Sequence, residues 1–381
     1  SYEKWVNDLI DAQGPDGILP SIVPSGGWGY FKTFWNTGSS IALFIIPWNL
    51  YVYEGDNKII SDVYPSVKKF LNWMLTKTEN GIVYWGHDPC RPYAPGRPPT
   101  NTPMEIISTA WYYEDIVIAS KMAGLLGHSE DQTAFLKRAD EIKAAFNREF
   151  FDHQTGRFKY PTQTGLGSAL YVQIADSSKV EELTSELVNA VTTSDFNIDF
   201  GVFGAKFVPN ALSQYGHSGV AFDFINSTRY PGWGNCVEGG ATTIWEFWNG
   251  EAALNQIAFG DVSAWFFKNL AGIRPDENHP GFKHCFIEPY FANDLEWVKA
   301  TKKTGYGDLK VYWHKKDRGI EFNLDVPVNT TVSVILPAGN LMIEGKKSEA
   351  GEEGINQINF ENNINRVNLG SGSFKLSLES L

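Results

Sequence analysis

Hydrophobic residues follow a helical period over roughly the first 275 residues and a strand period after about residue 290. Near the start, Trp5, Val6, Leu9 and Ile10 form the stripe of an amphipathic helix that ends before Gly14-Pro15. The same period predicts further helices at residues 41–53, 59–75, 104–126, 131–151, 168–174, 179–192, 204–214, 218–226 and 262–270. We therefore expect about ten or eleven helices, several of them long.

The C-terminal part of the chain shows the alternation of hydrophobic and polar residues that is typical of strands. The clearest alternating segments, separated by turns with Gly, Asp or Asn, are residues 309–313, 320–324, 331–335 and 374–378. They predict a small antiparallel β-sandwich of about 90 residues. We therefore expect two domains, a helical one at residues 1–290 and a β-domain at residues 291–381.

The connections between the predicted helices alternate between short ones and long ones rich in Gly, Pro and aromatic residues. Residues 14–35 contain five glycines and three prolines, and residues 85–103 contain six prolines. A toroid of helical hairpins would show this alternation. Loops this long in a compact helical domain are more often functional than decorative, so we expect them to share one functional face.

Composition narrows the classes of ligand. The 381 residues carry 44 acidic and 32 basic side chains, a net charge of −12, and 43% of them are hydrophobic. This content excludes intrinsic disorder, and no apolar run approaches the roughly 18 residues of a membrane-spanning helix. An acidic chain without a Lys/Arg cluster lacks the footprint of a nucleic-acid binder and would be repelled by anionic lipid, which leaves small neutral ligands. Three scattered cysteines and seven histidines show no metal-ligand spacing, so we expect no metal and no cofactor.

The clearest candidate chemistry lies in residues 239–248, where Glu246 is flanked by Trp245 and Trp248. An apolar, partly dry wall can tune a carboxylate, and indole faces pack on the C–H faces of sugars, so this combination favours glycoside hydrolysis. Thr243 and Glu246 also have the spacing of a helix capping box, in which the glutamate only satisfies a helix N-terminus. The residues alone leave both interpretations open.

Other candidate residues lie in the loops. Asp88 follows Trp85 in a Pro-rich segment, where it could bind sugar hydroxyls or form an Asx-turn before Pro89. Glu54, Asp56, Glu238 and Asp261 are weaker candidates that we expect to be loop or cap residues. Six tryptophans in or beside Gly-rich loops could line a sugar cleft: Trp28, Trp35, Trp85, Trp233, Trp245 and Trp248.

Several segments together resemble the bacterial α-L-rhamnosidases of glycoside hydrolase family 78. The segments that carry the resemblance are residues 239–246, 230–234, 258–260, 270–273 and 280–282, with 11–17, 46–56 and 144–147 in family order. The resemblance implies an (α/α)₆ barrel followed by a β-sandwich, and hydrolysis of terminal α-L-rhamnosides with inversion. Its substrate would be an oligosaccharide or a rhamnosylated small molecule.

The resemblance also implies roles for single residues. Glu246 takes the place of the general base, Trp35 resembles an indole that contacts the sugar, and Asp88 lies in the region of a Gly-Asp-Trp segment. Gln256 stands where family members carry a sugar-facing histidine. With the loop indoles Trp85, Trp233 and Trp245, these residues form the expected substrate site.

The stretch that carries the family's general acid has no match in these 381 residues. We therefore expect the barrel to lack its first helices and the acid to lie upstream, in a longer polypeptide. Two alternatives stay open: a carbohydrate-binding or degenerate hydrolase-like protein without turnover, and an α/α-barrel hydrolase for another deoxy or uronic sugar.

Overall fold

The computed structural model describes residues 2–27, 29–30, 41–84, 102–317, 319–345, 351 and 354–379. The chain divides into two compact units. The first contains residues 1–48 and 58–262, and the second contains residues 49–57 and 263–381. Among the residues that the structure describes, none of the helices combines the length and apolar character that a membrane crossing needs.

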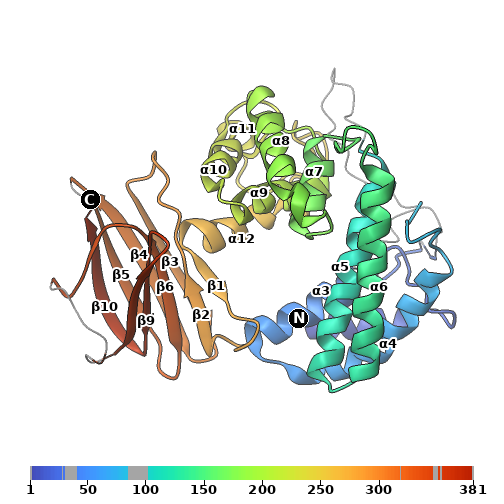
Figure 1. Cartoon of the computed structure of the whole chain (residues 1–381), viewed down its shortest axis with the longest axis horizontal. Coiled ribbons are helices and arrows are strands. Elements are labelled where there is room, and N and C mark those ends of the chain that lie inside the picture. Colours follow the sequence, from blue (N-terminus) through green and yellow to red (C-terminus); the bar gives the residue numbers. More distant parts are fainter. Residues whose placement is uncertain are drawn as a thin grey trace. The chain divides into compact units, whose positions relative to one another are not determined.

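The first unit is helical (Figure 1). Its helices are α1 (Tyr2–Ala12), α4 (Asn57–Leu75), α5 (Met104–Leu125), α6 (Ser129–Phe150), α7 (Gln163–Tyr171), α8 (Val180–Thr193), α9 (Val202–Gln214), α10 (Ser218–Asn226) and α11 (Trp233–Glu238), with 3₁₀ turns η1 (Ser177–Lys179) and η2 (Ile257–Phe259). Helices α3 (Ala42–Glu54) and α12 (Asp261–Trp265) are divided between the two units, and the first residue of α4, Asn57, belongs to the second.

Helices α5 and α6 show why the sequence forms helical hairpins. In α6, Phe135, Ala139, Ile142 and Phe146 repeat at one-turn spacing and are buried, while the opposite face is polar. Helix α5 is buried on most sides, and apolar residues make up most of its buried positions. The two lie side by side and are joined by a short turn (Figure 1). Burial of the apolar stripe of α6 against α5 therefore stabilises this hairpin.

The second unit is a β-sandwich that follows a short π-helical turn, η3 (Phe266–Leu270). Its strands are β1 (Ile273–Pro275), β2 (His284–Ile287), β3 (Trp297–Thr304), β4 (Gly307–Lys316), β5 (Gly319–Val326), β6 (Thr331–Pro337), β7 (Asn340–Ile343), β8 (Ile355–Glu361), β9 (Ile364–Leu369) and β10 (Gly372–Glu379). They form two five-stranded sheets, in the orders β1-β2-β6-β9-β8 and β3-β4-β5-β10-β7. The pairings are antiparallel except that of β2 with β6, which is parallel.

Alternation along the strands separates the core from the surface. In β4, Leu309, Val311 and Trp313 are buried, whereas the residues between them face outward. The inward residues of both sheets form one hydrophobic core, and Tyr53, from the α3 segment of this unit, packs against it. The change from helices to strands that the period predicts is confirmed.

Candidate active site

Glu246 lies on a loop that connects α11 to η2. Helix α11 ends at Gly239-Gly240, where Gly240 adopts φ +88°, and residues 241–256 form neither helix nor strand. Backbone hydrogen bonds join the two arms of this loop, from Gln256 N–H to the Ile244 carbonyl (2.8 Å) and from Glu246 N–H to the Ala253 carbonyl (2.9 Å). The loop is therefore a hairpin-like structure held by its own backbone.

The surroundings of Glu246 do not fit a helix cap. No helix begins at Thr243 or Glu246, and the Thr243 hydroxyl donates instead to the Leu254 carbonyl across the loop. The half-buried Glu246 carboxylate accepts a hydrogen bond at Oε2 from the Ala253 N–H, at 3.2 Å. Among the described residues, none donates a hydrogen bond to Oε1. The side chain is thus oriented through one oxygen, and the other is available to a ligand or water.

Three indoles in and beside the loop lie at different depths, Trp245 and Trp248 within it and Trp233 on α11. Trp245 is half-buried, and a Cβ on Gly250 would lie 3.1 Å from its ring, so glycine is needed there both for space and for φ +73°. Trp248 is 3% exposed and packs against Phe259 with 4.3 Å between ring centroids and the ring planes tilted by 44°. Trp233 is 7% exposed, meets Trp248 edge-on, and donates its indole N–H to the Phe259 carbonyl at 3.1 Å.

A polar cluster fixes the chain just after η2. Asp261, in the first turn of α12, accepts hydrogen bonds from Lys206 Nζ (2.9 Å) and Asn210 Nδ2 (2.8 Å), both on α9. Burial alone would lower the pKa of Lys206, but Tyr171 and Asp261 outweigh it and hold that pKa above its usual value. The sequence marks this cluster only through Asp261, a weak candidate there, and through a lone lysine in the apolar helix α9. Its role is to anchor the end of the loop that carries Glu246.

The structure brings together four of the predicted site residues. Glu246, Trp245 and Gln256 lie on the hairpin-like loop, with Gln256 next to Ile244 in its backbone pairing, and Trp233 contacts Trp248 of the same loop. Trp35, Trp85 and Asp88 fall outside the described residues. A role in sugar binding stays a prediction for each of these residues.

The helical and β-parts of the chain each match a known domain. Residues 1–270 match the bacterial α-L-rhamnosidase six-hairpin glycosidase domain, and residues 272–351 match the bacterial α-L-rhamnosidase C-terminal domain. The chain belongs to the bacterial α-L-rhamnosidase family. Its expected fold class is confirmed: a six-hairpin (α/α)₆ glycosidase domain followed by a β-sheet domain.

Similar members of the family come from several bacteria. An α-L-rhamnosidase of Alteromonas sp. strain LOR is 29% identical over 356 residues, which cover 88% of this chain and 38% of that protein. The structure of an α-L-rhamnosidase from Dictyoglumus thermophilum is 29% identical, covering 100% of this chain and 43% of that one, with a TM-score of 0.86. The Streptomyces avermitilis α-L-rhamnosidase complexed with L-rhamnose has a TM-score of 0.87 at 24% identity, covering 99% of this chain and 36% of that one. The chain thus spans less than half the length of each of these relatives.

Proposed function

We propose that this chain carries the general base of an inverting α-L-rhamnosidase and that Glu246 is this base. In the proposed reaction, Glu246 removes a proton from a water molecule as the water oxygen attacks the anomeric carbon. The glycosidic C–O bond breaks on the opposite face, and a general acid protonates the leaving oxygen. The proposal places this acid outside the 381 residues, because no segment of this chain resembles the family's acid-bearing stretch.

The observation that carries the proposal is the setting of the Glu246 carboxylate. It lies half-buried on a loop, next to Trp245, with Oε2 held by the Ala253 N–H and Oε1 left unpartnered by the described residues. A base needs this combination of fixed orientation and one oxygen open to water. Family membership and the L-rhamnose complex of the Streptomyces avermitilis relative support L-rhamnose as the sugar.

Replacement of Glu246 by Gln in the full-length protein tests the proposal. Glutamine keeps the shape and can still accept from the Ala253 N–H, but it cannot take a proton. We expect turnover of an aryl α-L-rhamnoside to fall by a factor of about 10² to 10⁴ or more, with rhamnose binding largely intact. Glu251→Gln, at an exposed glutamate of the same loop, is the matched control and should keep its activity. Unchanged turnover in Glu246→Gln would sink the assignment.

The choice of leaving group separates a base from an acid. A dinitrophenolate leaves without a proton, so loss of a general acid is largely masked with a dinitrophenyl rhamnoside, whereas loss of the base is not. We therefore expect Glu246→Gln to lose similar factors on a dinitrophenyl and on an alkyl α-L-rhamnoside. A protein that binds rhamnose in calorimetry and forms no product with either substrate would instead be the carbohydrate-binding alternative.

A further inference from the structure

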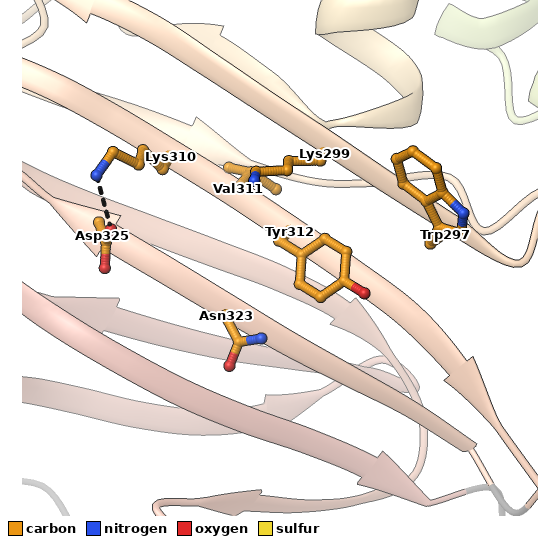
Figure 2. Close-up of a pocket in the computed structure, with 7 residues that line it drawn as sticks. All are labelled: Trp297, Lys299, Lys310, Val311, Tyr312, Asn323 and Asp325. Atoms are coloured by element: carbon orange, nitrogen blue, oxygen red, sulfur yellow. Dashed lines mark hydrogen bonds and ion pairs between the residues drawn. The ribbon is translucent and has the colours of Figure 1, made fainter.

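The outer face of the sheet β3-β4-β5 carries a groove that the proposed reaction does not use. It has a volume of about 510 Å³ and is lined by Trp297, Lys299, Lys310, Val311, Tyr312, Asn323 and Asp325. Figure 2 shows these residues on three neighbouring strands. Pockets that bind small ligands fall in the range of about 300–1,000 Å³, so this groove has room for sugar rings.

Register explains why aromatic and polar side chains meet in the groove. Lys299 is opposite Tyr312, which in turn is opposite Asn323, so the three share the outer face of the sheet. Trp297 is opposite His314 on the same face, and diagonal neighbours of this kind are roughly 7–8 Å apart. Trp297 and Tyr312 thus stand on adjacent strands and bound a space between them (Figure 2).

The two aromatic rings differ in how they are held. Trp297 is 58% exposed, although it sits in a regular strand, whereas Val311 and Trp313, on the inner face of the neighbouring strand β4, are fully buried. The Tyr312 ring stacks on His314 at 5.2 Å, and His314 Nε2 lies 3.3 Å from Glu321. The Tyr312 ring is therefore held in place by its neighbours, whereas the indole face of Trp297 is accessible to a ligand. Such faces pack on the apolar C–H faces of pyranose rings.

The charges in the groove are unequally paired. Lys310 is paired with Asp325 at 3.3 Å (Figure 2). Asp325 also accepts a hydrogen bond from the Ser373 hydroxyl. Lys299 is exposed and makes no ion pair with any residue in the described part of the chain. The groove thus offers one uncompensated ammonium next to an indole, on a chain whose net charge is −12. This local charge complements a carboxylate, which differs from the neutral ligands that the net charge favours.

We propose that this groove is a second carbohydrate-binding site, separate from the Glu246 loop, and that it takes an acidic glycan with uronate rings. One pyranose ring packs on Trp297 and its carboxylate pairs with Lys299. Tyr312, Asn323 and the Lys310–Asp325 pair hydrogen-bond the ring hydroxyls, as polar groups beside an aromatic platform do in sugar sites. The site would hold an acidic polysaccharide on the β-domain without cleaving it.

Calorimetry with a short oligogalacturonide tests this site in the full-length protein. Its fully methyl-esterified form has the same backbone without charge and is the matched ligand control. We expect the acid form to bind, the ester to bind at least about five-fold more weakly, and free L-rhamnose at saturation to leave binding unchanged. Absence of binding, or equal affinity for acid and ester, would overturn the proposal.

Substitutions in the groove test whether the oligogalacturonide binds there. We expect Trp297→Ala to weaken it by about ten-fold and Lys299→Met by roughly two- to five-fold, with Lys299→Arg close to wild type. Phe360→Ala, at an aromatic residue that is 57% exposed on the other sheet, and Lys303→Met, at an exposed lysine further along β3, are the controls. Equal affinity of Trp297→Ala and Phe360→Ala for the acid oligosaccharide would refute the site. If Trp297→Ala fails to fold, the affinity of Lys299→Met decides instead. Binding retained in Glu246→Gln separates this site from the proposed reaction.

Discussion

Asp115 is an acid in the middle of the buried helix α5, with 1% of its surface exposed. Burial, helped by the charge of Glu114, raises the pKa of Asp115 well above its usual value. In the unfolded chain the carboxyl releases its proton near pH 3.9, whereas the folded state retains it to higher pH. Between these pKa values, rising pH therefore favours unfolding, and the native aspartate lowers stability at neutral pH.

We expect Asp115→Asn to raise the free energy of unfolding at pH 7 by about 1–3 kcal/mol, because asparagine has the same shape and no titratable proton. The gain should shrink as the pH falls toward 4, where the unfolded state keeps its proton as well. Urea unfolding of both proteins between pH 4.5 and 8 measures this slope. A gain that stays constant over this range would contradict the raised pKa.

Single residues also show how far the sequence predicts the site. The residues around Glu246 indicated a functional carboxylate. A capping box requires that a helix follow Thr243, and only the structure shows that none does. The Lys206–Asp261 contact joins residues 55 positions apart, so no local pattern contains it. Lys206 was visible only as a charge in an apolar helix, and its partner follows from how α9 and α12 pack.

Among the elements, long periodic helices were predicted closely and very short strands were missed. The helix expected at residues 104–126 is α5 (Met104–Leu125). Strands β1 and β2 have three and four residues, too few for a period of two to be recognised. The parallel pairing of β2 with β6 was not expected either, because it joins strands that are distant in sequence and so leaves no turn signal.

Helices α4 and α6 are linked by a side-chain contact whose contribution to stability depends on pH. Asp131, in the first turn of α6, accepts hydrogen bonds from Lys68 (2.7 Å) and Tyr64 (2.8 Å) of α4. Lys68 and then Tyr64 lower the pKa of Asp131. The stabilisation is therefore complete above the unfolded pKa near 3.9 and is lost as pH falls through the folded pKa.

We expect Asp131→Asn to lower the free energy of unfolding at pH 7 by about 0.5–1 kcal/mol, since the contact is partly exposed to solvent. This difference should shrink as the pH falls below 4 and through the lowered pKa of Asp131. Asp140→Asn, at an exposed aspartate of the same helix, is the control and should change stability little at either pH. Chemical unfolding at pH 7 and pH 3.5 gives the comparison, and an equal loss at both pH values would rule out the carboxylate as its source.

At the scale of the whole chain, the second unit, which contains the β-sandwich (the β-unit), is not one continuous stretch of sequence. Residues 49–57 belong to it, although more than 200 residues separate them from Ser263. Gly281 N–H donates to the Val52 carbonyl at 2.9 Å, Tyr53 meets Phe282 edge-on at 5.8 Å, and Lys302 Nζ lies 5.3 Å from the Tyr53 ring centroid. The hydrophobic period could not predict that residues 49–57 belong to the second unit, because it indicates one uninterrupted helix over α3.

We expect Tyr53→Ala in the full chain to destabilise the β-unit by about 1–3 kcal/mol, because it removes a ring pair and a cation–π contact together with buried area. Amide hydrogen exchange should then speed up in the strands of the sandwich and remain unchanged in α5 and α6. Tyr84→Ala, at an exposed tyrosine of the helical unit, is the control and should leave both unchanged. If Tyr53→Ala instead loosened α5 and α6 and spared the strands, residues 49–57 would belong energetically to the helical unit, and the β-unit would be stabilised by residues 263–381 alone.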